Sequence, residues 1–132
     1  MEVRLIWANL MSGDIARTRQ FYTALGFKPN QGDTREDMTS FVFGQSKFII
    51  NFFTQERLSE EANGNLKSAA NGGENLFSLS ADSKEEVNQW VEKVTTAGGT
   101  IFSEPQDYEK GYTFGFADPD GHKFNVLYWP GM

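Results

Sequence analysis

The chain has 132 residues, enough for one domain, of which 39% are hydrophobic and 14% aromatic. A net charge of −6 and the lack of any basic run argue against a surface for nucleic acid or an anionic membrane. There is no cysteine, which rules out disulfides and thiolate chemistry and fits a cytoplasmic protein. No apolar run reaches the roughly 18 to 20 residues of a membrane span, and the first residues do not resemble a signal peptide.

The first half of the sequence predicts a strand, a helix and two or three further strands. Residues 3–11 read as a buried strand. Asp14 can cap a helix that Gly26 ends. Two apolar runs on either side of GQSK predict a hairpin within residues 39–53. The apolar positions of the helix recur at helical spacing: Ile15, Thr18, Phe21, Tyr22 and Leu25.

Residues 55–74 differ in character from the rest of the chain. They are polar, rich in Asn, Gly, Ala and Glu, and hold one marginal helical stretch at 56–62. Loops of this length are uncommon inside compact domains. We interpret the segment as a linker or mobile flap.

The second half repeats the pattern of the first. A strand at 75–82 precedes a helix with Asp82 at its N-cap, Glu85 close to a capping-box position and Gly98-Gly99 at its end. Strands follow at 100–104, 112–118 and 123–129. This repeat of about sixty residues predicts one α+β domain of two βαβββ modules, residues 1–54 and 75–132, forming a curved mixed sheet with a cleft.

Alternation along the strands predicts which side chains line the cleft. One face of each strand is almost wholly apolar and belongs under the helices. The other face mixes amides and hydroxyls with large apolar groups that are too numerous for open water. We expect this mixed face to bind a small molecule, although the amides could instead form a structural network with trapped water. The candidate ligand-binding residues are Trp7, Asn9, Asn51, Leu76, Ser78, Tyr108, Tyr112, Asn125 and Trp129.

Several other residues carry reactive groups without a clear pattern. Glu104, Asp107 and Glu109 lie in what the sequence predicts to be a loop, where they are either a solvated acidic stretch or an acid–base group at the cleft mouth. His122 is the only histidine and belongs to a DPDGH turn, which favours a role in the turn over proton transfer. No catalytic residue can be assigned.

The paired modules, together with FYTALGF at 21–27 and ADPDGHKFNVLYW at 117–129, resemble the vicinal oxygen chelate superfamily, which includes glyoxalases, dioxygenases and bleomycin resistance proteins. The resemblance covers nearly the whole chain. EPQDY at 104–108 is further similar to a bacterial subgroup of predicted lactoylglutathione lyases. The resemblance implies a cytoplasmic homodimer with a small-molecule site.

Metal-using members of that superfamily bring His, Gln or Glu inward from the first and fourth strands of each module. The resemblance places these positions at Trp7, Asn51, Leu76 and Asn125. Trp and Leu cannot bind a divalent ion, and a neutral Asn oxygen replaces carboxylate poorly. Shifting the alignment by one residue yields no His, Asp or Glu. We therefore expect no metal and no other cofactor.

Three functions remain open at this stage. The first is metal-independent binding of a small amphiphilic or aromatic molecule. The second is a glyoxalase-like lyase or isomerase of the lactoylglutathione lyase type, acting on a small carbonyl compound. The third is a structural subunit that offers its apolar face to a partner.

Overall fold

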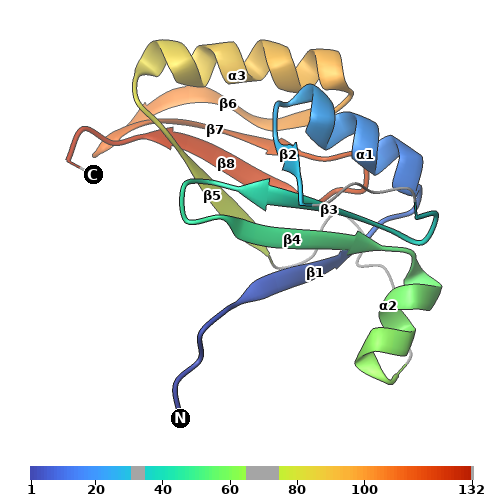
Figure 1. Ribbon diagram of the computed structural model, residues 1–132. Coiled ribbons are helices and arrows are strands. Elements are labelled where there is room, and N and C mark those ends of the chain that lie inside the picture. The colour runs from blue at the N-terminus through green and yellow to red at the C-terminus, as the bar shows by residue number, and fades with distance from the viewer. Residues whose placement is uncertain (31–34, 65–74, 132) are drawn as a thin grey trace. The chain divides into compact units, whose positions relative to one another are not determined.

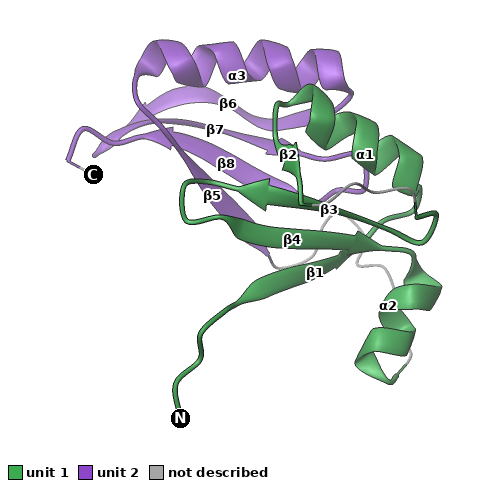
Figure 2. Ribbon diagram, in the orientation of Figure 1, with its two compact units in different colours: residues 1–68 green, residues 69–132 purple. Residues whose placement is uncertain are grey.

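A computed structural model describes residues 1–30, 35–64 and 75–131. The chain divides into two compact units, residues 1–68 and 69–132 (Figure 2). Each unit repeats the same order of strand, helix and three strands, as the sequence predicts. The described residues contain no helix long and apolar enough to cross a membrane.

The first unit is a four-stranded mixed sheet in the order β1-β4-β3-β2 (Figure 1). β1 runs parallel to β4, whereas the other neighbours are antiparallel. Its elements are β1 (Trp7–Met11), α1 (Ile15–Ala24), β2 (Lys28–Pro29), β3 (Met38–Phe43), β4 (Phe48–Phe53) and α2 (Gln55–Ala62).

Helix α1 covers one face of this sheet. The Asp14 side chain caps it by accepting a hydrogen bond of 3.0 Å from the backbone N–H of Arg17, and Gly26 follows its end at φ +97°. Tyr22 of α1 is fully buried and stacks on Phe52 of β4 with ring centroids 4.7 Å apart. The predicted helix and its buried face are confirmed.

The second unit is built in the same way, with strand order β5-β8-β7-β6 and β5 parallel to β8. Helix α3 covers one face of the sheet, burying Val87 and Val94 completely. Its elements are β5 (Leu76–Ala81), α3 (Lys84–Ala97), β6 (Thr100–Tyr108), β7 (Gly111–Ala117) and β8 (Lys123–Tyr128).

The predicted cap of the second helix is wrong by one residue. Ser83, not Asp82, is the N-cap, and its hydroxyl accepts from the Glu86 N–H at 3.0 Å. The Glu86 carboxylate accepts from the N–H of Asp82, one residue before the N-cap, rather than from the N–H of Ser83 as in a capping box. Asp and Ser are equally good caps, so composition alone cannot choose between adjacent ones.

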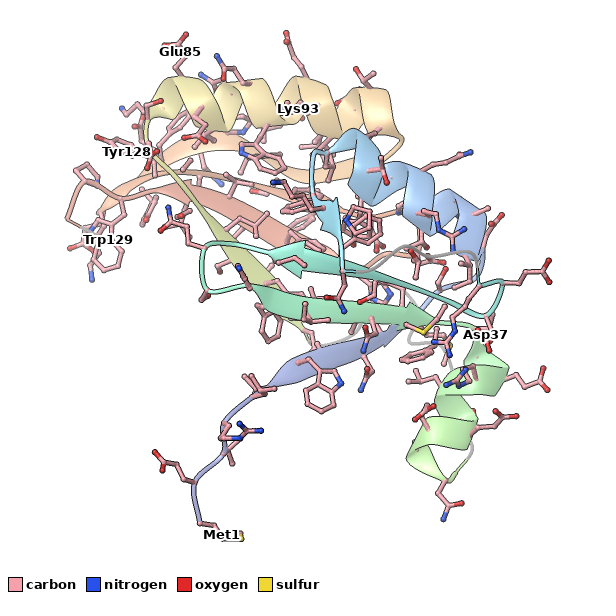
Figure 3. All side chains as sticks on the ribbon, in the orientation of Figure 1. Met1, Asp37, Glu85, Lys93, Tyr128 and Trp129 are labelled. Atoms are coloured by element: carbon pink, nitrogen blue, oxygen red, sulfur yellow. The ribbon has the colours of Figure 1, made fainter. Side chains whose placement is uncertain are left out.

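The first strand is also shorter than predicted. It begins at Trp7, and Val3, Leu5 and Ile6 are 71–83% exposed in the segment before it. Figure 1 shows this segment leaving the sheet beyond the end of β1, and Figure 3 places Met1 at its tip. Apolar composition predicts strand character but not the presence of a neighbouring strand.

Part of the predicted linker is ordered as helix α2, which confirms the helical stretch at 56–62. Thr54 caps it, and Leu58 is buried. An ion pair of 3.0 Å from Arg57 to Asp37 attaches the helix to the segment before β3, and a second pair of 2.8 Å, to Glu61, lies within the helix. The rest of the predicted flap, residues 65–74, lies outside the described residues.

Candidate functional site

In the first unit, three polar side chains form a row across the face of the sheet opposite α1. We use the term helix-free for the face opposite α1 or α3, although Arg57 of α2 lies over Phe53 on this face, at the end of β4. Asn9, Asn51 and Ser40 are register partners on β1, β4 and β3. Ser40 Oγ donates to Asn51 Oδ1 at 2.6 Å, and Asn51 Nδ2 donates to Asn9 Oδ1 at 3.0 Å. The two predicted amides therefore meet, and Asn51 has both its oxygen and its nitrogen bonded.

The corresponding row of the second unit has a different composition. Ser78, Asn125 and Gly115 are register partners on β5, β8 and β7. Asn125 matches Asn51, but glycine stands where the first unit has the Ser40 hydroxyl. Asn125 Oδ1 is buried and has no hydrogen-bond partner among the described residues. An acceptor left in this state costs about 1–3 kcal/mol.

The ring of Phe102 takes the space that a side chain at position 115 would fill. A β-carbon at Gly115 would lie 2.5 Å from Phe102 Cζ. A side chain at position 115 would therefore have to displace the Phe102 ring, and the backbone conformation gives no separate reason for glycine there. Lys123 is two residues before Asn125 on β8, so its side chain leaves the same face of the sheet. Its Nζ lies 5.4 Å from the Phe102 ring centroid.

Large apolar side chains flank both rows. Trp7 and Leu76 are each 53% exposed, and Trp129 is 37% exposed. Trp129 lies just beyond the end of β8, as Figure 3 shows, and Lys110 Nζ is 4.9 Å from its ring centroid. Each helix-free face thus combines uncharged polar groups with hydrocarbon, as the alternation predicts, and the face of the second unit also carries the charged Lys123.

Trp129 also borders a hollow of about 460 Å³ at the ends of β5 and β8. Ser80, Asp82 and Tyr128 line the same hollow. A second hollow, of about 610 Å³, lies along α2. Neither is lined by a member of the two polar rows.

The two predicted tyrosines leave opposite faces of their sheet, because Tyr108 pairs with Gly111 and Tyr112 pairs with Asp107. Tyr112 lies on the helix-covered side of its sheet, because its hydroxyl donates to Asn88 Oδ1 of α3 at 2.9 Å. Tyr108 ends β6 and is 38% exposed. Its contact with a ligand stays a prediction.

The acidic stretch after the predicted strand at 100–104 was predicted to be a loop, and this is wrong. β6 continues through Glu104 and Asp107 to Tyr108 and pairs with β7. Asp107 accepts from Lys84 Nζ at 2.7 Å, and this hydrogen bond raises the pKa of Lys84 above its ordinary 10.5. In the first unit, hydrogen bonds to Glu61 and then Asp37 raise the pKa of Arg57.

His122 belongs to the turn between β7 and β8. Its backbone N–H donates to Asp118 Oδ1 at 2.9 Å, and the Asp120 N–H donates to the same oxygen at 3.0 Å. Gly121 supplies the left-handed conformation at φ +92°. The turn role predicted for this motif is confirmed.

The side chains at the positions implied for a metal do not suit one. Trp7 and Leu76 offer no donor atom for a divalent ion. Asn51 has its amide oxygen committed to Ser40, and Asn125 provides a single neutral oxygen. Within residues 1–30, 35–64 and 75–131, no three His, Asp or Glu side chains are placed so that they could hold a metal ion together.

Sequence reasoning missed three residues that shape the second row: Phe102, Gly115 and Lys123. No usable signal was present for any of them. Ser40 lies eleven residues before Asn51 and Gly115 lies ten residues before Asn125, so aligning the modules on the two asparagines places Phe114 opposite Ser40. The side on which Phe102 lies could not be predicted either, because β6 has register shifts on either side of Ser103.

Two βαβββ units with α-helices on one face and mixed polar and apolar groups on the other define a paired-module α+β protein. The model of the Glyoxalase/Bleomycin resistance protein/Dioxygenase superfamily matches residues 4–126. The chain belongs to this superfamily. The resemblance inferred from its motifs is thereby confirmed at the level of the family.

Solved structures give the same fold. The hypothetical protein SA1046 from S. aureus is 32% identical, with 97% of this chain and 95% of that chain covered and a TM-score of 0.82. A glyoxalase-related enzyme from Fulvimarina pelagi is 20% identical over 97% and 90%, with a TM-score of 0.84. A lactoylglutathione lyase from Agrobacterium tumefaciens is 18% identical over 97% and 96%, with a TM-score of 0.67. No curated protein matches the sequence.

Proposed function

We propose that this protein binds a small amphiphilic or aromatic molecule without a metal ion, against the helix-free faces of its sheets. One observation carries the proposal. At the four positions where the resemblance places metal-ligating side chains, this chain has two neutral amides, Asn51 and Asn125. The other two positions hold the exposed apolar side chains of Trp7 and Leu76. Such a lining supplies shape and a few polar anchors, which suffices for binding.

The amide row of the first unit supports a fixed anchor. Asn51 is held by Ser40 on one side and Asn9 on the other, so little side-chain entropy of Asn51 is lost when a ligand binds to it. Trp7, on the same face, offers a broad exposed ring for stacking. We expect aromatic or amphiphilic compounds to stack on such side chains while one polar group bonds to an amide.

A thermal-shift screen of metabolites and glycopeptide antibiotics, run with and without EDTA, tests the proposal. We expect at least one compound to raise the melting temperature equally under both conditions, because ligand bound only to the folded state stabilises it. Stabilisation that EDTA removes would contradict metal independence. A complete absence of hits would contradict the binding function.

The second candidate is a glyoxalase-like lyase or isomerase, which the fold shared with the Agrobacterium lactoylglutathione lyase favours. Such chemistry stabilises an enediolate, normally with a metal ion. Amide donors provide weaker stabilisation. An assay with methylglyoxal and glutathione, repeated with Ni²⁺ and Zn²⁺, distinguishes the two functions. Metal-dependent turnover would overturn our interpretation of Asn51 and Asn125.

We also propose that two copies of the chain associate. The exposed apolar side chains of Val3, Leu5 and Ile6 support this, since they stand beside β1, an edge strand of its sheet. Light scattering on the purified protein should give twice the mass of the chain. A monomer at all concentrations would contradict association.

A further inference from the structure

The buried oxygen of Asn125 requires a hydrogen-bond donor that the described residues do not supply. In the first unit the matching oxygen accepts from Ser40 at 2.6 Å. In the second unit Gly115 removes that hydroxyl, and Asn125 Oδ1 is left buried without a partner. The two rows are otherwise built on the same register, so the missing donor is a specific feature of the second unit.

The Phe102 ring lies against Gly115, the register partner of Asn125. Phe102 lies over Gly115 and is 47% exposed, although it sits on a strand. A half-exposed ring that rests on glycine can turn about its side-chain torsions without disturbing the backbone. Turning it aside would open the space next to Asn125.

A positive charge stands next to the same ring. Lys123 precedes Asn125 by two residues on β8, so both side chains leave the same face about 7 Å apart. Lys123 Nζ lies 5.4 Å from the Phe102 centroid, and no carboxylate forms an ion pair with it in the described part of the chain. A cation over an aromatic face is available to an anionic ligand.

We infer that Asn125, Phe102 and Lys123 form a subsite for a small planar acid that also carries an O–H or N–H donor. The ligand's donor bonds to Asn125 Oδ1, its ring stacks on the displaced Phe102, and its carboxylate pairs with Lys123. This inference rests on the proposed binding function and names its ligand class. Phe102 is the side chain that determines specificity, because the site opens only when it turns.

The probe is p-hydroxybenzoate, whose hydroxyl and carboxylate stand at opposite ends of one ring, with p-methoxybenzoate as its matched partner lacking the donor. Calorimetry should show p-hydroxybenzoate binding about tenfold more tightly, since one hydrogen bond to a buried acceptor contributes about 1.4 kcal/mol. Asn125→Ala should abolish this difference. Lys123→Gln should weaken both probes by a similar factor and preserve their ratio.

Lys93→Gln is the control variant. Lys93 makes the same kind of contact, with its Nζ 6.0 Å from the Trp90 centroid, but it belongs to α3. It should leave both affinities unchanged. Equal affinities of the two probes for the unmodified protein, an unchanged ratio in Asn125→Ala, or no saturable binding in the millimolar range would overturn the subsite. Compounds from the thermal-shift screen that still bind Asn125→Ala would show that the binding function survives that failure.

Discussion

The two units place an asparagine at the same point of the same strand arrangement and surround it differently. In the first unit Asn51 is bonded by Ser40 and Asn9, which holds its amide in a fixed position. In the second unit the register partner of Asn125 is a glycine that the Phe102 ring covers, and the Asn125 oxygen has no partner among the described residues. The central asparagine of the first row thus has hydrogen-bond partners, whereas the oxygen of the corresponding asparagine in the second row has none among the described residues. The same residue at matching positions of the two units therefore need not have the same role.

The largest expected effect comes from breaking the satisfied row. Asn51→Ala removes two hydrogen bonds and leaves the Ser40 hydroxyl, which is 6% exposed, without its acceptor. We expect the free energy of unfolding to fall by about 2–3 kcal/mol, measured by urea denaturation. Asn9→Ala, which removes only the 3.0 Å bond, is the control and should cost about 1 kcal/mol. Equal costs for both variants would contradict the central position of Asn51.

The next effect comes from converting the second row into the first. Phe102→Ala opens the space over position 115, and Gly115→Ser in that background supplies a hydroxyl next to Asn125. We expect the serine variant to be about 1 kcal/mol more stable than Gly115→Ala in the same background. Alanine is the matched control, because it adds the same β-carbon and removes the same glycine entropy. If alanine and serine are equally stable, the Asn125 oxygen is not the acceptor we describe.

A smaller effect, of opposite sign to that of Asn51→Ala, is expected at Asn125 itself. Asn125→Ala removes a buried acceptor that has no partner, so the lost packing is offset by the relieved desolvation penalty. The free energy of unfolding should stay the same or rise by up to about 1 kcal/mol. Urea denaturation beside Asn51→Ala gives the direct comparison. A loss as large as that of Asn51→Ala would mean that Asn125 is as firmly bonded as its counterpart.

These contrasts also mark where the sequence stops being informative. Alternation along β4 and β8 predicts that Asn51 and Asn125 leave the helix-free face, because residues two apart share a side. It does not predict that Ser40 reaches Asn51, since pairing across strands depends on register. It predicts even less about Phe102, because the register shifts in β6 break the alternation there. The fold could therefore be predicted, but the partner of each amide could not.

The predicted boundaries of β1 and β6 were wrong for related reasons. Glu104 to Tyr108 read as a loop because their composition is polar, yet β7 provides the pairing partner that makes them a strand. Conversely, Val3 to Ile6 were predicted to be part of the first strand, but β1 begins only at Trp7. Strand length is decided by neighbours that lie far away in the sequence.

The smallest expected effect concerns the ion pairs that each unit carries away from its polar row. Asp107 raises the pKa of Lys84 above its unfolded value of 10.5, so the stabilisation by this pair is fully present below about pH 10.5. It is lost as the pH rises through the raised folded-state pKa. Arg57 in the first unit stays protonated over this pH range, so its pairs with Glu61 and Asp37 persist while the Lys84 pair is lost.

The difference in melting temperature between the unmodified protein and Lys84→Gln should shrink above about pH 10.5, whereas the difference caused by Arg57→Gln should not. Because both side chains are at the surface, each difference is expected to be small, and salt should reduce both. A Lys84→Gln difference that stays constant up to the highest pH at which the protein folds would contradict the titration, and would leave the bond between Lys84 and Asp107 without energetic weight.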